Sequence, residues 1–225
     1  MTPSTPDRLI AEMQDAHRRT MALIKGLSPE QMIGPKLATV NPLLWEIGHA
    51  AYFYEYWVLR QHLGRAPVID EADALYDSIT IAHDDRWDLP LPQLDETLGY
   101  IDQVRARVTE ALGEGDDPRR DYLAQYGVFH QDMHNEAYTY TRQTLGYPAP
   151  EFDAAPPVTG ASTAAAADAD VAIPGGTFML GARPEDGFVF DNEKWAHPVE
   201  IAPFSIAKTA VSNRQLRAFV EAGGY

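Results

Sequence analysis

The chain has no cysteine, few basic residues and no long apolar run, and each shortage excludes a class of protein. Without cysteine there can be no disulfide, thiolate zinc site or cysteine nucleophile, so any bound metal must be held by His, Asp, Glu or backbone oxygen. Because 33 Asp and Glu face only 18 Lys and Arg, the formal net charge is -15. Such a charge disfavours binding to nucleic-acid phosphates and to anionic membrane surfaces.

Targeting signals are also missing from the sequence. The N-terminus, MTPSTPDRLIAEM, lacks the basic and apolar blocks of a signal peptide. No apolar stretch approaches the roughly 18 residues that a membrane-spanning helix requires. We therefore expect a soluble cytoplasmic protein whose partners are neither nucleic acid nor membrane.

Hydrophobic spacing predicts a mainly helical first half. Apolar residues recur at helical intervals in four stretches, at about 6–26, 41–62, 93–113 and 118–145. The second stretch is expected to begin at Asn41-Pro42, with Asn41 as the capping residue, and it is aromatic on more than one face. Four long helices joined by one long crossover, at about 65–92, favour a four-helix bundle.

After the bundle the composition changes twice. Residues 148–170 are rich in Ala and Pro and read as a linker, whereas 171–225 show short strand patterns and one helix at about 213–222. About 55 residues of this kind cannot easily close a core, so we expect the beginning of a second domain that continues beyond Tyr225. The predicted domains are thus a bundle at 1–147, the linker, and a fragment at 171–225.

Three histidines of the predicted bundle form a candidate metal site. His130 and His134 are four residues apart on one helix, so their imidazoles lie on one face, one turn apart. His49 lies within another apolar helix, between the small residues Gly48 and Ala50. A shared metal would satisfy these rings, although core histidines without metal are the alternative. Three neutral nitrogens could hold Zn, Ni or Fe.

The remaining candidates are predicted to have structural roles. Glu136 lies about 200° around the helix from His134, so it is not expected to bind the same ion. The other histidines are interpreted as packing, helix-end or surface residues: His17, His62, His83 and His197.

Five motifs resemble one known enzyme family in their order along the chain. WEIGHAAYFYEYW (45–57) and FHQDMHNEAYTYTRQ (129–143) resemble the DinB-like bundle of ergothioneine sulfoxide synthases, in which one early histidine precedes an HxxxHxE motif. The later motifs resemble the formylglycine-generating-enzyme-like (FGE-sulfatase, C-type-lectin-like) α+β domain that follows that bundle: IPGGTFMLG (173–181), FDNEKWAHPVEIAPFSI (190–206) and VSNRQLRAFVEAGGY (211–225).

The resemblance implies a non-haem iron enzyme. His49, His130 and His134 match the family's Fe(II) ligands, and Glu136 matches the final motif position. Family members join a chalcogen donor to C2 of the imidazole of hercynine, a trimethylated histidine betaine, with O2 as oxidant. The family's catalytic tyrosine is expected beyond Tyr225, so no catalytic residue can be assigned within this chain.

The crossover departs from the sulfur-using members. ALYDSITIAHDDRWDLPLP (74–92) is more similar to selenoneine synthase, which uses a selenosugar, and Met133 replaces a frequent glutamine. We therefore expect a selenium donor, with a sulfur donor (cysteine or gamma-glutamylcysteine) as the alternative. Arg86 is predicted to bind polar groups of the donor, or else to pair with Asp84 or Asp85. A DinB-like thiol transferase using Zn or Ni, and a non-catalytic bundle, are further alternatives.

Overall fold

The computed structural model describes residues 5–152 and 169–224. The chain divides into two compact units, Met1–Ala154 and Ala155–Tyr225. Most of the predicted linker, residues 153–168, lies outside the described residues. The predicted domain boundaries therefore stay a prediction.

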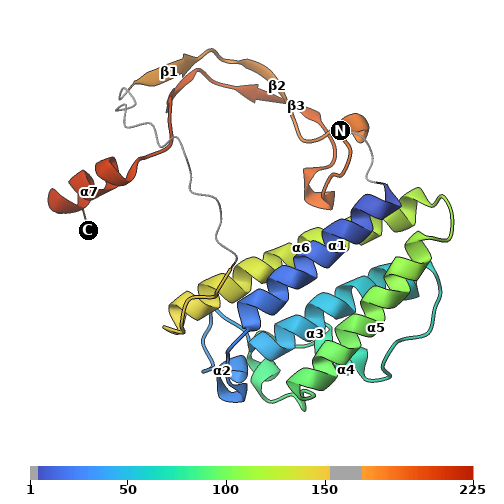
Figure 1. Cartoon of the computed structure of the whole chain (residues 1–225). Helices are drawn as coiled ribbons and strands as arrows, with labels where there is room; N and C mark the ends of the chain where they lie inside the picture. Colours follow the sequence, from blue (N-terminus) through green and yellow to red (C-terminus); the bar gives the residue numbers. More distant parts are fainter. Residues whose placement is uncertain (1–4, 153–168, 225) are drawn as a thin grey trace. The chain divides into compact units, whose positions relative to one another are not determined.

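Four long helices build the first unit, as the apolar spacing predicts (Figure 1). They are α1 (Pro6–Ile24), α3 (Leu43–Tyr54) with its π-helical continuation η1 (Glu55–His62), α5 (Leu94–Leu112) and α6 (Pro118–Thr144). Helix α1 packs against α6, and α3 packs against both α5 and α6. Between α1 and α3 lies the short α2 (Pro29–Ile33), which begins with a capping box at Ser28.

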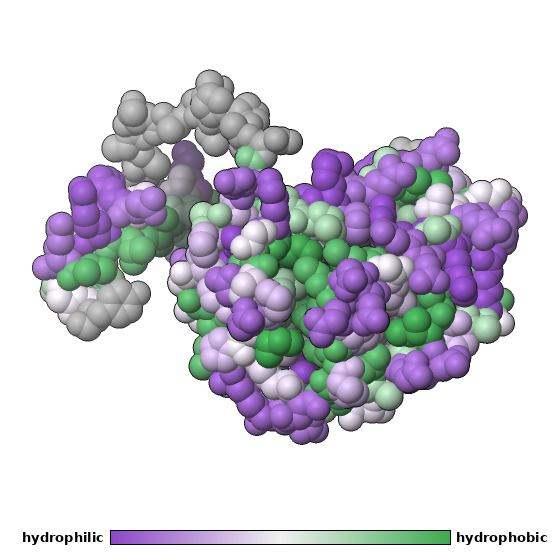
Figure 2. Space-filling view, turned by 60° about the horizontal axis from the view of Figure 1, so that its bottom comes forward, coloured by the Kyte–Doolittle hydropathy of each residue, from purple (hydrophilic) through white to green (hydrophobic). Residues whose placement is uncertain are grey.

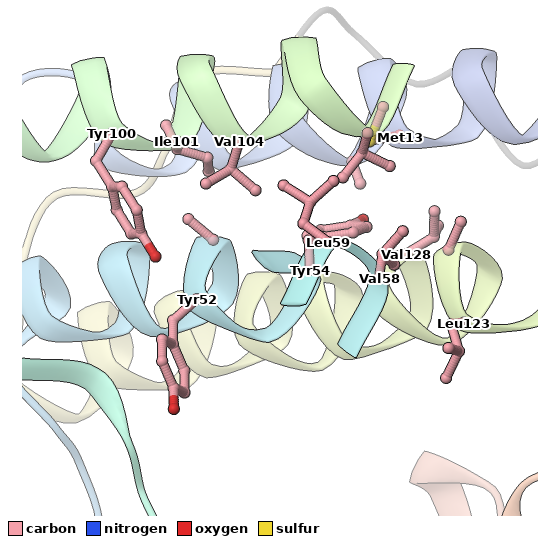
Figure 3. Packing of buried hydrophobic residues seen from close by; sticks show 14 of the residues in the cluster. Met13, Tyr52, Tyr54, Val58, Leu59, Tyr100, Ile101, Val104, Leu123 and Val128 are labelled. Carbon is pink, nitrogen blue, oxygen red and sulfur yellow. The ribbon is translucent and has the colours of Figure 1, made fainter. Parts of the chain in front are cut away.

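The core of the bundle consists of two apolar clusters, and the larger one lies between α3, η1 and the other long helices. Tyr54 and Leu59 meet Val104 of α5 and Val128 of α6 there (Figure 3). A Cβ on Gly127 would lie 2.3 Å from the Tyr54 ring, so this glycine lets α6 approach the end of α3 closely. The same packing brings the middle of α3 against α6, where the predicted histidines lie.

The start of α3 differs from the prediction. The helix begins at Leu43 with Pro42 as its N-cap residue and no side-chain cap, so the prediction that Asn41 caps it is wrong. Asn41 instead donates from Nδ2 to Oε1 of Glu46, at 2.8 Å. The π-helical geometry of η1 was also not predicted, because apolar spacing does not distinguish a π turn from an α turn.

The long crossover is ordered and carries two short helices, α4 (Ala72–Tyr76) and the 3₁₀ helix η2 (His83–Trp87). Helix α4 packs on α3, and its Leu75 and Tyr76 are buried. A long loop that contains its own packed elements is typical of a functional segment.

The second unit contains two antiparallel strand pairs and one helix. Strand β1 (Asp170–Ile173) pairs with β4 (Phe204–Ala207), and β2 (Gly176–Leu180) pairs with β3 (His197–Ile201). The 3₁₀ turns η3 (Pro184–Asp186) and η4 (Asp191–Glu193) connect β2 to β3, and α7 (Asn213–Glu221) follows β4. Large apolar side chains of both pairs, such as Phe178 and Ile206, are about half exposed.

The visible surface of the helical unit is mixed in hydropathy. Hydrophilic residues interrupt the hydrophobic ones over the visible face of the helical unit (Figure 2). Among the described residues, no helix has the length and apolarity needed to cross a bilayer.

Candidate metal centre

The fold brings the three predicted histidines together. His49 comes from the middle of α3, and His130 and His134 come from successive turns of α6. One ring nitrogen of each residue lies within 4.8 Å of the corresponding nitrogen of the other two. The ring centroids are 5.0 Å apart from His49 to either partner and 4.5 Å apart between His130 and His134.

The spacing of the nitrogens fits a shared ion. Nε2 of His130 and Nε2 of His134 are 3.3 Å apart. Two nitrogens each about 2.1 Å from one ion, at an angle of about 90–110°, lie roughly 3.0–3.4 Å apart. The pair on α6 therefore already has the separation that coordination requires.

Helix α4 orients His49. Nδ1 of His49 lies 2.7 Å from the carbonyl oxygen of Tyr76, which leaves Nε2 as the ligand atom. The indole of Trp45 stacks on the His49 ring at 4.7 Å, with an interplanar angle of 9°. Trp45 in turn donates from Nε1 to the carbonyl oxygen of Leu75, at 2.8 Å. Two consecutive backbone carbonyls of α4 thus hold a stacked pair of rings.

A buried glutamate orients His134. Nδ1 of His134 lies 3.2 Å from Oε2 of Glu46, whose residue is 1% exposed. Metal-binding histidines commonly donate their other N–H to such a group. Glu46 was not predicted from the sequence, although it lies three residues before His49 and so on the same side of α3.

Stacking rather than a hydrogen bond orients His130. The Phe53 ring lies 3.8 Å from the His130 ring at an interplanar angle of 13°. Within 5–152 and 169–224, Nδ1 of His130 is buried and has no hydrogen-bond partner. Aromatic contact therefore holds the ring that lacks a polar support.

Burial keeps the imidazoles of His49 and His130 neutral. Burial lowers the pKa of His49 to about 3, and the neighbouring His134 contributes to that shift. Burial, and next the neighbouring histidines, hold the pKa of His130 well below its ordinary value. A neutral imidazole offers a lone pair to a cation without first losing a proton, so the donor set fits a divalent metal.

Arg86 lies beside the histidine centre. Its NH1 group donates to Oδ1 of Asn41 at 2.7 Å, and its guanidinium carbon lies 4.0 Å from the centroid of the Trp45 ring. In the part of the chain that the structure describes, Arg86 forms no ion pair with Asp84 or Asp85, so that alternative is wrong. Burial lowers the pKa of Arg86, and the charge of Glu46 opposes the shift.

The other candidates lie apart from this centre. Glu136 is exposed and is not part of the cluster. Nε2 of His17 lies 3.8 Å from Asp102, and Nε2 of His62 lies 2.7 Å from Asp117. His83 and His197 contact backbone carbonyls.

A helical bundle with three converging histidines defines the class to which the chain belongs. Three nitrogens on one side of an ion leave further coordination positions open, which suits catalysis more than a structural role. The chain belongs to the DinB superfamily, whose model matches residues 12–145. Residues 156–225 match the model of the sulfatase-modifying factor enzyme 1-like domain, so the bundle is followed by the start of a second, strand-containing domain.

Two curated relatives are similar to nearly the whole chain, and a third is similar to a short part of it. A hercynine oxygenase of Mycolicibacterium smegmatis is 28% identical over 222 residues, which are 97% of this chain and 51% of the relative. A hercynine oxygenase of Mycolicibacterium thermoresistibile is 28% identical over 226 residues, covering 96% and 49%. A formylglycine-generating enzyme of Thermomonospora curvata is 53% identical over 55 residues, 24% of this chain and 18% of that protein. The chain spans about half the length of the hercynine oxygenases it matches.

Proposed function

We propose that His49, His130 and His134 bind one Fe(II) and that the protein is a non-haem iron enzyme acting on hercynine. The observation that carries the proposal is the convergence of three imidazoles in a chain similar over nearly its whole length to hercynine oxygenases. Bound iron would supply a site where O2 and the chalcogen donor are activated side by side. The protein's own residues orient the three rings, through hydrogen-bond contacts at Nδ1 of His49 and His134 and through stacking on His130.

For the donor, we propose a selenosugar, which would give a product that carries the selenosugar on C2 of the hercynine imidazole. Its support is the crossover at 74–92, which resembles that of selenoneine synthase and contributes Tyr76 and Arg86 to the centre. Cysteine or gamma-glutamylcysteine is the second candidate, which the similarity to hercynine oxygenases supports. Either donor would become bonded to C2 of the hercynine imidazole.

Arg86 is proposed to bind the polar groups of the donor. Its Nε is buried and without a hydrogen-bond partner among the described residues, and its guanidinium stacks on the indole that also covers His49. An unused donor on a cation beside the metal centre suits a carboxylate or sugar oxygen. Arg86→Met should therefore raise KM for the donor at least about tenfold, because one charge-assisted hydrogen bond contributes roughly 1.5–3 kcal/mol. Unchanged donor KM with normal metal content would contradict the assignment.

We also propose the functional division of the chain: the metal centre within 1–147, a linker at 148–170, and part of the substrate pocket from 171 onward. The match to the sulfatase-modifying factor enzyme 1-like domain at 156–225 supports the last part. In this division the second domain would supply the catalytic tyrosine that the resemblance implies.

The test is a product analysis with the complete gene product. The protein is loaded anaerobically with Fe(II), given hercynine and O2, and offered each donor in turn, and products are identified by mass. A selenium-containing product formed faster from the selenosugar supports the selenium assignment, and a sulfoxide from a thiol supports the sulfur alternative.

Metal analysis separates the other functions. Tightly bound Zn or Ni, with thiol transfer that does not require O2, would instead identify a DinB-like transferase. If His134→Ala changes stability but leaves metal content unaltered, the histidines are core residues and the proposed function is wrong.

A further inference from the structure

We propose that Glu46 is a positioning residue, which holds the proton of His134 on Nδ1 and so keeps Nε2 directed at the metal. The inference rests on the proposed function only in requiring that the three histidines bind a divalent metal. It concerns a carboxylate that lies outside the histidine cluster but contacts one of its rings.

Both oxygens of Glu46 are used as acceptors. Oε1 accepts from Nδ2 of Asn41 at 2.8 Å, and Oε2 lies 3.2 Å from Nδ1 of His134. The residue is 1% exposed, so water does not compete for these positions. Both oxygens thus lie in acceptor positions, so the geometry favours the proton on Nδ1 of His134, which leaves the lone pair on Nε2.

Asn41 fixes the orientation of the carboxylate. Its Nδ2 donates to Glu46, and its Oδ1 accepts from NH1 of Arg86 at 2.7 Å. The guanidinium, through Asn41, therefore lies in one hydrogen-bonded chain with Glu46 and His134. A buried carboxylate needs such compensation, and this arrangement provides a nearby positive charge without a direct ion pair that would draw Glu46 away from the imidazole.

The contacts continue from Arg86 to His49 on the other side of the centre. Arg86 stacks on Trp45, and Trp45 stacks on His49. His134 is thus connected to Arg86 by hydrogen bonds through Glu46 and Asn41. His49 is connected to the same Arg86 by stacking through Trp45. Among these residues, Glu46 is the one whose side chain accepts a hydrogen bond from a proposed metal ligand, His134. Its replacement should therefore affect metal binding most directly.

The variant that tests the inference is Glu46→Gln. The amide has the size of the carboxylate but only one acceptor oxygen, so it cannot accept from Asn41 and His134 on separate oxygens. An amide N–H facing His134 favours the proton on Nε2, which would block coordination. Glu55→Gln is the matched control, because Glu55 is 0% exposed, begins the continuation of the same helix and accepts from Tyr100 instead of a histidine.

The measurement is anaerobic titration of the full chain with Co(II), followed by its visible absorption. We expect Glu46→Gln to weaken Co(II) binding about 10- to 100-fold and to alter the absorption bands. Glu55→Gln should stay within about twofold of the wild type, because it lies away from the ligands. Equal affinity and spectra for wild type and Glu46→Gln would overturn the inference, whereas a wild type that binds no metal would instead overturn the proposed function.

A second measurement uses the wild type alone, so it does not depend on whether Glu46→Gln folds. Imidazole ¹⁵N NMR of the metal-free wild type reports which nitrogen of each histidine carries the proton. The inference requires His134 to be protonated at Nδ1, and an Nε2-protonated His134 would contradict it.

Discussion

At the scale of single residues, two buried glutamates on one continuous helix have different surroundings. Both oxygens of Glu46 have partners near the histidines. Glu55 accepts from the Tyr100 hydroxyl on Oε2, at 2.8 Å, but its Oε1 has no hydrogen-bond partner among the described residues. Burial raises the pKa of Glu55, although the bond from Tyr100 opposes that shift. Glu46 therefore contacts a histidine of the candidate metal centre, whereas Glu55 contacts a tyrosine of the bundle core.

The raised pKa of Glu55 predicts a pH-dependent contribution to stability. Because the folded state holds this proton more tightly than the unfolded chain, the contribution is complete below the unfolded pKa and is lost as pH rises through the folded pKa. Glu55→Gln has no proton to lose at this position, so its stability should not fall in this way. Its free energy of unfolding relative to the wild type should therefore increase as pH rises from about 4 to 8. Each pH unit that separates the folded from the unfolded pKa contributes about 1.4 kcal/mol to this difference. Urea unfolding of the metal-free protein at several pH values measures it.

The exposed Glu110→Gln on α5 is the control for that series, because its side chain is 71% exposed. It should leave the pH dependence of unfolding as in the wild type. If Glu55→Gln and Glu110→Gln behave alike, burial of Glu55 does not raise its pKa.

At the scale of elements, the contact of α4 with α3 holds His49 in place. Any side chain at Gly48 would occupy the space of Tyr76, since a Cβ there would lie 2.1 Å from Cε1 of that ring. The space beside Gly48 is thus filled by Tyr76, whose carbonyl oxygen lies 2.7 Å from Nδ1 of His49.

Gly48→Ala should therefore displace α4 and weaken the metal site. We expect a loss of about 1–3 kcal/mol in stability, as for other overpacked sites, together with weaker Co(II) binding. Gly99→Ala on α5 is the matched control, because nothing lies within 4 Å of the point that its Cβ would occupy. That change should instead stabilise the helix by about 0.5–1 kcal/mol. A Gly48→Ala variant with unaltered metal affinity would show that α4 does not support His49.

The helices could be predicted because their signals are local, whereas the supports of the centre could not. Spacing along the chain placed His130 and His134 on one face, and the apolar pattern placed His49 in a second helix. The contact from Glu46 to His134 joins residues 88 positions apart, and no periodicity encodes such a pairing. Asn41 fits the local pattern of a helix cap, but a hydrogen bond to Glu46 takes its side chain.

At the scale of the whole molecule, the metal centre ties together helices that are far apart in the sequence. His49 belongs to α3, and His130 and His134 belong to α6, so an ion held by all three would cross-link the second and fourth long helices of the bundle. An ion that binds the folded state alone stabilises it by mass action. The chain has no thiols, and the described part of the bundle brings three imidazoles together. Histidine is therefore the ligand type expected at this centre.

Metal binding should consequently raise the thermal stability of the chain. At a free ion concentration of about 100 times Kd the gain is about 2.7 kcal/mol, which corresponds to roughly 5–10 °C in Tm for a chain of this size. Anaerobic calorimetry with Fe(II) measures the shift, and His134→Ala should abolish most of it because one of the three ligands is lost. His17→Gln, on α1 and outside the cluster, should keep the shift even if it changes the starting Tm. An equal shift in His134→Ala would mean that the ion binds elsewhere on this acidic protein, and the cross-link between α3 and α6 would have to be abandoned.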